Sequence, residues 1–481
     1  MLAKKHDGQK TDYKARLVAR GFQEEYKPQA DSPTAMKESI KMFLAIAANE
    51  GFNLQSMDIR AAFLQSRSLD RDVFVEPPRD LKKDGIIWKL KKPLYGLDDA
   101  SRKFWLRVKD IFKQKGLKNV CGDEAFYYHH DGKNLVGMVI THVDDFTVAG
   151  TEEFIEDLTV RVQSALTVSK VEKDKFRFTG IDIQKTGNEI VMSMEDYANS
   201  IEEIKDIRKA KSDDPLTKLE LKVYRKYTGK IGWLAASTRP DLSITALQMS
   251  MKNNEAKIRD LKQINHVVKR IKDKPNQVVF SKVGEKDDLV VFGLGDASYR
   301  CDAKSIGGNL ILLGSKCTYN AVPIFWKSKT IQKVCHSAKA AETRNLSKLV
   351  DDSVFFATQF GQLIFGRSNA ESVILPVKLF TDSKPLLESI SSTKQVEERL
   401  LRNAVTDLKE KLEDTTVESY SWLRTNEMIA DILTKECKDN PDINKILIEN
   451  KFCYARNDKN LVSCVNGEIH MRNKIHECEN Y

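Results

Sequence analysis

At 481 residues the chain exceeds what one hydrophobic core usually organises, which excludes a single small domain and favours two or three domains. Hydrophobic residues make up 41% and charged residues 31%, a balance that excludes disorder throughout and is typical of a globular protein. The 78 Lys and Arg against 69 Asp and Glu give a net charge of +9. This excess favours a polyanionic partner, but only weakly, because many solvated surfaces carry as much charge.

The cysteines and the apolar runs indicate the redox environment of the protein and whether it enters a membrane. The eight cysteines show no paired close spacing and no apolar leader precedes the first domain, so we expect a reducing, intracellular environment. No uninterrupted apolar run approaches the roughly 20 residues of a bilayer span, so we expect no membrane insertion. Cys464, His470, His476 and Cys478 crowd the end of the chain, but their spacing fits no familiar zinc site.

Helices and strands mix in the first half of the chain. Apolar residues at helical spacing predict three helices, over 37–50, 98–115 and 153–166. Shorter apolar runs predict three strands, over 53–59, 135–140 and 146–149. The last two strands form a predicted β-hairpin with Asp144 and Asp145 at its tip, and Asp58 lies at the end of the first strand.

A change of pattern in the second half predicts another domain. A lysine-rich middle contains a predicted helix over 258–271, and we place a domain boundary shortly after it. Three successive strands are then predicted, over 289–295, 308–313 and 317–326. After them helices and strands alternate: helix 337–361, strand 377–381, helix 396–412, strand 417–423 and helix 427–435. This order favours an α/β (α+β) domain with a mixed sheet.

Three acids in the first half form a candidate metal site. Nucleotidyl transfer needs two divalent ions held by carboxylates, and oxygen ligands suit Mg²⁺. Asp144 and Asp145 at a hairpin tip, together with Asp58 at a strand end, are a candidate three-carboxylate set. An isolated Asp-Asp pair in a turn is, however, more often a solvated turn former. The acids alone therefore leave both interpretations open.

Longer motifs in this half resemble those of copia-type reverse transcriptases, from the Pol polyproteins of LTR retrotransposons. The similar segments are 13–22 (YKARLVARGF), 32–33 (SP), 57–64 (MDIRAAFL), 91–97 (KKPLYGL) and 142–145 (HVDD). The resemblance implies a right-hand polymerase with palm, fingers and thumb. It also implies that Asp58, Asp144 and Asp145 bind the metal ions, while Lys14 and Arg16 contact the incoming triphosphate.

The secondary roles have simpler alternatives. Lys14 and Arg16 alternate in a segment that resembles an edge strand, where cations often only maintain solubility. Tyr95 and Phe63 either line the nucleotide pocket, discriminating against a 2′-hydroxyl, or simply pack. His142 stands where the family usually has Tyr, a departure whose effect the sequence does not decide.

The second half carries four acidic motifs that resemble those of the retrotransposon ribonuclease H. They are 295–298 (GDAS), 340–343 (AAET), 380–383 (FTDS) and 430–435 (ADILTK). The resemblance implies that Asp296, Glu342, Asp382 and Asp431 converge on two Mg²⁺ ions that activate water for RNA hydrolysis. Such a site selects the RNA strand by its 2′-hydroxyls and the shape of the hybrid. Lys339 places a cation near this site, where a neutral residue was expected.

These motifs predict four regions. They are a reverse transcriptase over 1–245, thumb and connection helices over 246–285, a ribonuclease H-like domain over 286–440 and an uninterpreted tail over 441–481. The resemblance begins within the fingers at about residue 3, so we expect the family's upstream strands and helix to be missing and the fingers to be truncated. Segment 239–242 (RPDL) is similar to the thumb-side stretch of the family and is expected to serve architecture.

Three functional hypotheses follow. The first is an RNA-directed DNA polymerase with ribonuclease H activity, which uses Mg²⁺ (or Mn²⁺), dNTPs, an RNA template, a DNA primer and the RNA–DNA hybrid. The second is a defective remnant that at most binds nucleic acid or hydrolyses RNA, and the third is a non-catalytic nucleic-acid-binding protein. The resemblance further implies a role in transposition and DNA integration, other Pol or capsid products as partners, and a cytoplasmic, particle-associated location with access to the nucleus.

Overall fold

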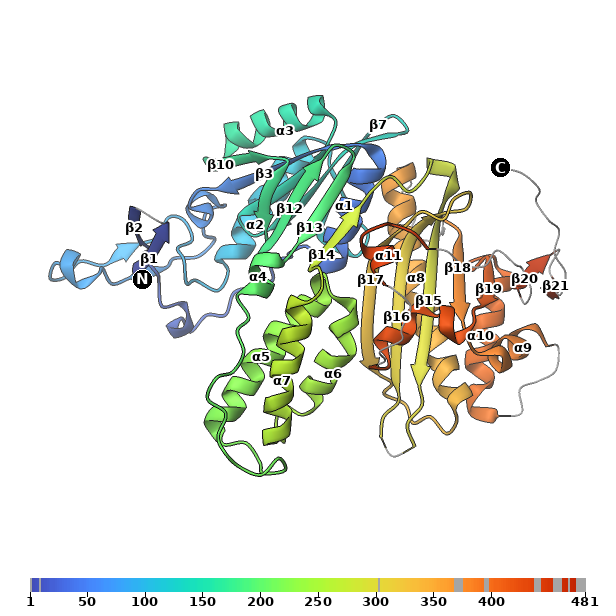
Figure 1. The fold of residues 1–481 in the computed structure, drawn as a ribbon. Coiled ribbons are helices and arrows are strands. Elements are labelled where there is room, and N and C mark those ends of the chain that lie inside the picture. The colour runs from blue at the N-terminus through green and yellow to red at the C-terminus, as the bar shows by residue number, and fades with distance from the viewer. Residues whose placement is uncertain are drawn as a thin grey trace. The chain divides into compact units, whose positions relative to one another are not determined.

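The computed structural model describes residues 2–7, 10–301, 303–366, 375–392, 398–436 and 443–452, and the backbone of 461–465 and 468–472. The chain forms two compact units (Figure 1). Unit 1 comprises residues 1–39 and 52–179, and unit 2 comprises residues 40–51 and 180–481. α1 (Lys37–Glu50) therefore begins in unit 1 and continues in unit 2. Among the described helices, none is long and apolar enough to cross a membrane.

Unit 1 is built on an antiparallel sheet of six strands in the order β10-β3-β9-β8-β7-β6. Their bounds are β3 (Asn53–Ile59), β6 (Lys118–Val120), β7 (Asp123–Asp131), β8 (Asn134–His142), β9 (Asp145–Gly150) and β10 (Val168–Lys173). α2 (Ala100–Gln114) and α3 (Glu152–Ala165) cover one face. Their apolar stripes join the sheet in one core, where Phe104, Phe112 and Phe154 lie with Phe146. The predicted hairpin and both predicted helices are confirmed.

Unit 1 also contains shorter elements. The remaining strands are β1 (Leu2–Asp7), β2 (Lys10–Ala15), β4 (Phe74–Val75), β5 (Trp88–Lys89) and β11 (Lys175–Phe178). β1 pairs with β2 and β4 pairs with β5, both antiparallel. The side chain of Lys14, which lies in β2, is outside the described residues.

Unit 2 begins with a small antiparallel sheet and a group of helices. Its strands are β12 (Ile181–Thr186), β13 (Glu189–Ser193) and β14 (Gln277–Phe280). Between β13 and β14 the chain forms α4 (Glu195–Asn199), α5 (Lys218–Ser237), α6 (Ser243–Met251) and α7 (Ile258–Lys272). α7 confirms the helix predicted over 258–271. The buried side of α7 carries the apolar residues at helical spacing that predicted this helix, such as Leu261, Ile264 and Val268.

A buried arginine joins these helices. Arg239 follows α5, and its side chain is 2% exposed. The guanidinium makes two hydrogen bonds to the Asp241 carboxylate, at 2.8 and 2.9 Å. It also donates to the Ile271 carbonyl at 3.1 Å and to Asn276 Oδ1 at 3.0 Å. Burial alone would raise the pKa of Asp241, but the bonds and charge of Arg239 outweigh it and the pKa lies below its usual value. Segment 239–242 therefore has a structural role.

The second sheet of unit 2 has seven strands in the order β17-β16-β15-β18-β19-β20-β21. Their bounds are β15 (Leu289–Ser298), β16 (Ile306–Ser315), β17 (Ala321–Thr330), β18 (Val377–Thr381), β19 (Ser419–Trp422), β20 (Leu461–Val465) and β21 (Glu468–Arg472). β15, β16 and β17 are antiparallel, whereas β18 runs parallel to both β15 and β19. The α/β class with a mixed sheet is confirmed. β20 and β21, which lie in the tail left uninterpreted, extend the sheet beyond β19.

Helices accompany this sheet. They are α8 (Ala338–Phe365), α9 (Lys384–Ser391), α10 (Arg402–Glu413) and α11 (Asn444–Leu447). The hydroxyl of Ser337 accepts a hydrogen bond from Ala340 N–H and caps the start of α8. α8 confirms the long helix predicted over 337–361, and its buried side includes Leu346, Leu349 and Phe356.

Three predicted elements were wrong in detail. The helix predicted over 396–412 is α10, which begins only at residue 402, after a 3-10 segment at Arg399–Leu401. The strand predicted over 317–326 is β17, which begins only at residue 321, because the Ser315 hydroxyl accepts the Cys317 and Thr318 N–H groups and forms a turn first. The helix predicted over 427–435 is a pair of 3-10 segments, Thr425–Glu427 and Ile429–Leu433. The side chains of Thr434 and Lys435, which follow the second segment, contact the acids of the site described below. The four predicted functional regions do not coincide with the two compact units and remain a prediction.

Candidate active sites

The hairpin of β8 and β9 gathers the first acidic group in unit 1. His142 pairs with Asp145 across the hairpin, so Val143 and Asp144 form its two-residue turn. Val143 has φ +57°, a left-handed conformation that β-branched residues rarely adopt. Such strain persists only where the surroundings impose it, and it is frequent at functional sites. The Ile59 N–H donates to the Asp144 carbonyl at 3.0 Å, which fastens the tip to the end of β3.

The three acids of the first group are half-buried and face one another. Asp58 lies opposite Asp145 in the register of β3 and β9. Burial, followed by the charges of Asp144 and Asp58, raises the pKa of Asp145 to about 6. Burial and the charge of Asp58 also raise the pKa of Asp144, against the lowering effect of Arg16 and His142. Ser169 donates its hydroxyl to the Asp58 carboxylate. A group of half-buried carboxylates that repel one another favours a bound cation.

Two aromatic rings and an arginine lie beside these acids. The Arg16 guanidinium carbon is 5.5 Å from the centroid of the Tyr95 ring, and the Tyr95 and Phe63 centroids are 4.7 Å apart. Burial and the charge of Asp144 raise the pKa of Tyr95 above its usual value. Arg16 is exposed at this side of the acids. The arrangement suits the predicted role of Arg16 and the ring pair, which stays a prediction.

A glycine fixes the approach of the Arg16 segment to Tyr95. The Ala19 N–H donates to the Tyr95 carbonyl at 2.7 Å. Gly96 has φ +93°, and a Cβ on it would lie 2.1 Å from the Ala19 carbonyl oxygen. Only glycine permits both this backbone conformation and this contact. The motif at 91–97 therefore contributes backbone shape as well as a ring.

His142, the residue that departs from the family pattern, lies next to the hairpin turn. Its ring makes an edge contact with Phe178, with centroids 6.4 Å apart. Burial lowers the pKa of His142, although the charge of Asp144 opposes this effect.

The second acidic group lies in unit 2, where strands β15 and β18 meet helix α8. Asp296 is near the end of β15, Glu342 is in the second turn of α8 and Asp382 follows β18. Each of these residues offers one carboxylate oxygen within 4.8 Å of the other two. The Ala297 N–H donates to Glu342 Oε1 at 3.0 Å and orients that carboxyl group. Among the described residues, no other group of His, Cys, Asp or Glu is gathered as tightly.

Burial and mutual repulsion dominate the electrostatics of the second group. Burial, followed by the charges of Asp296 and Asp382, raises the pKa of Glu342 to about 9. Burial raises the pKa of Asp296 to about 6, although the hydroxyl of Thr434 donates to this carboxylate and opposes the change. Three oxygen donors in a half-closed, acid-rich site fit Mg²⁺, which prefers oxygen ligands. The first acidic group has the same donor chemistry in a looser arrangement.

Lys435 is the cation of the second group, and sequence reasoning missed it. Its ammonium forms an ion pair with Asp431 and lies 3.8 Å from Asp296 Oδ1. Burial alone would lower the pKa of Lys435, but the bond to Asp431 and the nearby carboxylates raise it. Lys339, the cation noted in the sequence, has no ion pair recorded within the described part of the chain. The signal for Lys435 was present, because it stands four residues after Asp431 in the 430–435 motif.

Asn345 is a second residue that the motifs did not reveal. Its side-chain amide donates to the Asp296 carbonyl at 2.9 Å and to the Gly308 carbonyl at 3.2 Å. This clamp holds the end of β15 against α8. The neighbouring Gly307 has no room for a side chain, because a Cβ on it would lie 2.1 Å from Asn345 Oδ1.

We expect Gly307→Ala to weaken the second acidic group. The added methyl group must displace the Asn345 amide, so the thermal midpoint should fall, with a loss of about 1–3 kcal/mol of stability. Gly229→Ala is the matched control, because Gly229 lies in α5 with nothing within 4 Å of its Cβ position, and alanine there should stabilise by about 0.5–1 kcal/mol. Differential scanning calorimetry of the full chain measures both. Equal midpoints for the two variants would contradict the clamp.

The chain is similar to a described protein family and to several curated proteins. Residues 1–215 match the family described as reverse transcriptase (RNA-dependent DNA polymerase). The chain is 27% identical over 362 residues to the retrovirus-related Pol polyprotein from transposon RE1 of Arabidopsis thaliana, covering 71% of this chain and 24% of that protein. It is 23% identical over 422 residues to the transposon Ty1-ER2 Gag-Pol polyprotein of Saccharomyces cerevisiae, covering 81% and 21%. The chain thus spans about a quarter of the length of these relatives.

Two solved structures are similar at low identity. The foamy viral protease-reverse transcriptase in complex with double-stranded DNA matches with a TM-score of 0.20 and 12% identity, covering 81% of this chain and 60% of that one. LC11-RNase H1 in complex with an RNA/DNA hybrid matches with a TM-score of 0.23 and 14% identity, covering 31% and 96%.

The class that these findings support is a retroelement Pol protein, because residues 1–215 match the reverse transcriptase family. The curated relatives that the chain resembles are Pol polyproteins of copia-like retrotransposons.

Proposed function

We propose that this chain is an RNA-directed DNA polymerase with ribonuclease H activity. The observation that carries the proposal is that one chain contains two separate carboxylate groups, one at the tip of a strained hairpin and one at the meeting point of β15, β18 and α8. The reverse transcriptase family match covers the first group. Its substrates would be an RNA template, a DNA primer and dNTPs for polymerisation, and the RNA–DNA hybrid for hydrolysis.

In the polymerase site, Asp58, Asp144 and Asp145 would hold two Mg²⁺ ions, or Mn²⁺ in their place. Bound at either site, such ions activate the attacking oxygen and stabilise charge on the phosphate. The Ser169 hydroxyl fixes the orientation of Asp58. Arg16, and Lys14 by the same resemblance, would bind the triphosphate, and the ring pair of Tyr95 and Phe63 would pack against the nucleotide.

In the hydrolytic site, Asp296, Glu342, Asp382 and Asp431 would hold two Mg²⁺ ions, each residue as predicted from its motif. The contacts divide these acids into the tight triad of Asp296, Glu342 and Asp382 and the paired Asp431. Lys435 neutralises charge between Asp296 and Asp431. Its ammonium pairs with one oxygen of Asp431, and the other oxygen would serve as the ligand. Asn345 and Thr434 hold Asp296 in position.

The raised pKa of Glu342 predicts a pH dependence for cation binding. Without a cation, the folded chain retains the Glu342 proton from the ordinary pKa of 4.5 up to about 9, whereas the unfolded chain releases it. Stability should therefore decrease as pH rises through this window. Binding Mg²⁺ displaces the proton, so affinity should rise up to about tenfold per pH unit for each proton displaced. Calorimetric titration at pH 6 and pH 8 in buffers of different ionisation enthalpy measures the affinity and the proton release. Glu342→Gln should reduce both dependences, and an equal proton release by Glu342→Gln would contradict the assignment.

The decisive experiment measures both activities on the full chain. With Mg²⁺ and an RNA template carrying a labelled DNA primer, we expect primer extension and cleavage of the RNA in the hybrid. Asp382→Asn should lose RNA cleavage and keep extension, whereas Asp414→Asn, an exposed acid of the same unit, should keep both. The hydrolytic assignment fails if the chain leaves the hybrid intact and Asp382→Asn behaves identically. Cleavage without extension would instead support the alternative, a copy that retains only ribonuclease H activity.

The setting of this activity follows from the same family. We propose that the protein acts in transposition, with DNA integration as a later step, together with other Pol or capsid products of the element. Its proposed location is a cytoplasmic particle with access to the nucleus. Fractionation of cells that express the tagged chain together with the element's capsid product tests this location.

A further inference from the structure

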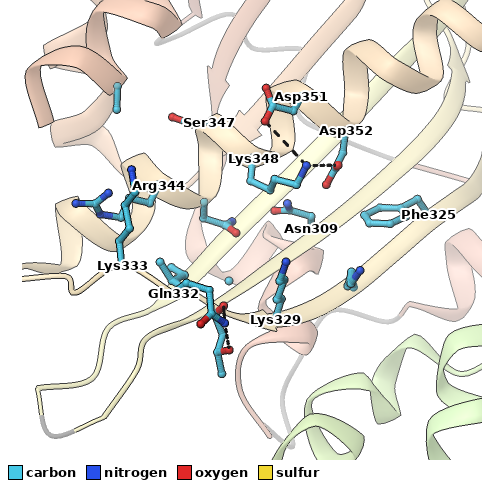
Figure 2. Close-up of a pocket in the computed structure, with 16 residues that line it drawn as sticks. Asn309, Phe325, Lys329, Gln332, Lys333, Arg344, Ser347, Lys348, Asp351 and Asp352 are labelled. Carbon is cyan, nitrogen blue, oxygen red and sulfur yellow. Dashed lines mark hydrogen bonds and ion pairs between the residues drawn. The ribbon is translucent and has the colours of Figure 1, made fainter. Parts of the chain in front are cut away.

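A cavity of about 660 Å³ lies in unit 2, apart from the acids of both groups (Figure 2). Its wall comes from β16, β17, the segment after β17 and the flank of α8, and none of Asp296, Glu342, Asp382 or Asp431 lines it. In Figure 2, Lys333 and Arg344 lie on one side of the cavity and Phe325 on the other, with Asn309 between them. Asn345 lines the cavity and also holds the Asp296 carbonyl, so the cavity adjoins the second acidic group.

The cavity carries an excess of positive charge. Five cations line it, Lys327, Lys329, Lys333, Arg344 and Lys348, against the two carboxylates of Asp351 and Asp352, which leaves a net charge of +3. Lys348 is neutralised, because its ammonium lies 2.8 Å from Asp352 and 3.9 Å from Asp351. For the other four cations, the described residues provide no ion pair. The unpaired charges favour an anionic ligand that makes several contacts.

Two of the residues that line the cavity each carry a buried polar atom with no hydrogen-bond partner among the described residues. Asn309 is 6% exposed, and its Oδ1 accepts no hydrogen bond from the described residues. The buried Nε of Arg344 likewise donates to none of them. Buried polar groups are normally paired, because an unpaired one loses its solvation without compensation. A ligand that satisfies both atoms must present an acceptor to Arg344 and a donor to Asn309.

We propose that this cavity binds an unpaired nucleotide of a nucleic-acid strand. Phosphate oxygens supply the acceptors for Arg344 and the lysines, while a base amino group or a sugar hydroxyl supplies the donor for Asn309. Lys327 and Lys329 stand two residues apart on the same face of β17, about 7 Å along the strand. This spacing would let them contact successive phosphates of a nucleic-acid backbone. Phe325 provides an apolar wall, and a cationic groove with an aromatic side chain is the usual composition of a single-strand site.

This inference goes beyond the proposed function, because it concerns binding without catalysis. The test therefore uses the full chain in EDTA, where no divalent ion supports either reaction. A single-stranded DNA oligonucleotide with one photoreactive thiouracil base is bound, irradiated and mapped by mass spectrometry. Cross-links to residues of β17 or the flank of α8 are expected, and cross-links confined to unit 1 would overturn the proposal.

Charge-reversal variants measure how much the cavity lysines contribute to oligonucleotide affinity. The double variant Lys329→Glu/Lys333→Glu should weaken oligonucleotide binding at least about tenfold and reduce the slope of log K against log salt by about 0.7 for each lost phosphate contact. The control is Lys316→Glu, an exposed lysine just after β16 that does not line the cavity, and it should bind as the parent does. Equal weakening by the two variants would reveal only a general charge effect and would overturn the site.

Asn309→Ala separates binding from folding. Because Asn309 Oδ1 has no partner among the residues that the structure describes, this variant should keep or raise the thermal midpoint while it loses oligonucleotide affinity and the β17 cross-links. Unchanged affinity and cross-links would overturn the role of Asn309. Competition distinguishes a strand from a free nucleotide as the ligand. If a deoxynucleoside monophosphate removes the cross-links at the same concentration as a short oligonucleotide, the ligand is a free nucleotide and the proposal of a strand is overturned. Equal competition by polyglutamate would exclude a nucleotide site.

Discussion

Asp145→Asn is expected to abolish primer extension and to leave RNA cleavage unchanged. The Asp145 carboxylate faces Asp58 in the strand register, and its pKa of about 6 reflects burial beside two other acids. The amide is similar in shape but carries no charge to hold a divalent ion. Loss of a hydrogen-bonding partner of a metal ligand already costs roughly 10–100-fold. Loss of a ligand should cost more, so we expect extension to fall by at least about 100-fold in a single-turnover assay.

The matched control for this variant is Asp131→Asn. Asp131 is an exposed acid at the end of β7, beside the turn that joins β7 to β8 in the same sheet. Its replacement should leave extension within about twofold, because exposed substitutions away from a site have small effects. If Asp145→Asn extended primers as well as Asp131→Asn did, the hairpin tip would not be the polymerase site.

Arg239→Leu is expected to destabilise unit 2 more than any surface substitution. The change removes the Arg239 guanidinium from the Asp241 carboxylate, which is 13% exposed and keeps the longer contact of 3.7 Å to Arg270, and it leaves Asn276 Oδ1 without this donor. Removing one partner of a buried ion pair costs about 3–5 kcal/mol. Denaturant unfolding of the full chain, followed by circular dichroism and tryptophan fluorescence, should show a large decrease in the midpoint. Exposed Arg208 pairs with Glu220 at 3.1 Å, so Arg208→Leu should cost about 1 kcal/mol or less.

Two further measurements separate the ion pair from general packing. The double variant Arg239→Leu/Asp241→Leu should recover part of the loss, because no unpaired carboxylate remains. The pKa of Asp241 is held below its ordinary value of 3.8, so the contribution of the pair is present above that pH and is lost as pH falls through the depressed pKa. The deficit of Arg239→Leu should therefore shrink in acid. A deficit that is independent of pH and of Asp241 would show that Arg239 acts only as packing volume.

The two acidic groups differ in what holds them together. The group at Asp58, Asp144 and Asp145 depends on strand register and on the strained turn at Val143. The group at Asp296, Glu342 and Asp382 depends on contacts between a strand and a helix, where the Asn345 clamp reaches across. We therefore expect the first group to tolerate changes in its helices better than the second tolerates changes in α8.

Most of the regular structure was predictable from the sequence, because periodicity is a local property. The stripe of Phe104, Val108 and Phe112 indicated α2, and the hairpin of β8 and β9 followed from two apolar runs around adjacent acids. The predictions failed where side chains redirect the backbone. The Ser315 hydroxyl delays the start of β17, and the segment around Asp431 forms 3-10 turns rather than an α-helix.

The sequence by itself determined the family resemblance and the seven candidate acids, because the chemistry requires carboxylates in recognisable motifs. Only the tertiary structure decided which side chains contact those acids and hold them in position. Ser169 meets Asp58 across 111 residues of chain, and Thr434 meets Asp296 across 138. Lys435 rather than Lys339 is the cation among the carboxylates, and two polar atoms of residues lining the cavity beside α8 have no partner within the described part of the chain. Such contacts depend on how distant segments pack, a property that neither spacing nor composition encodes locally.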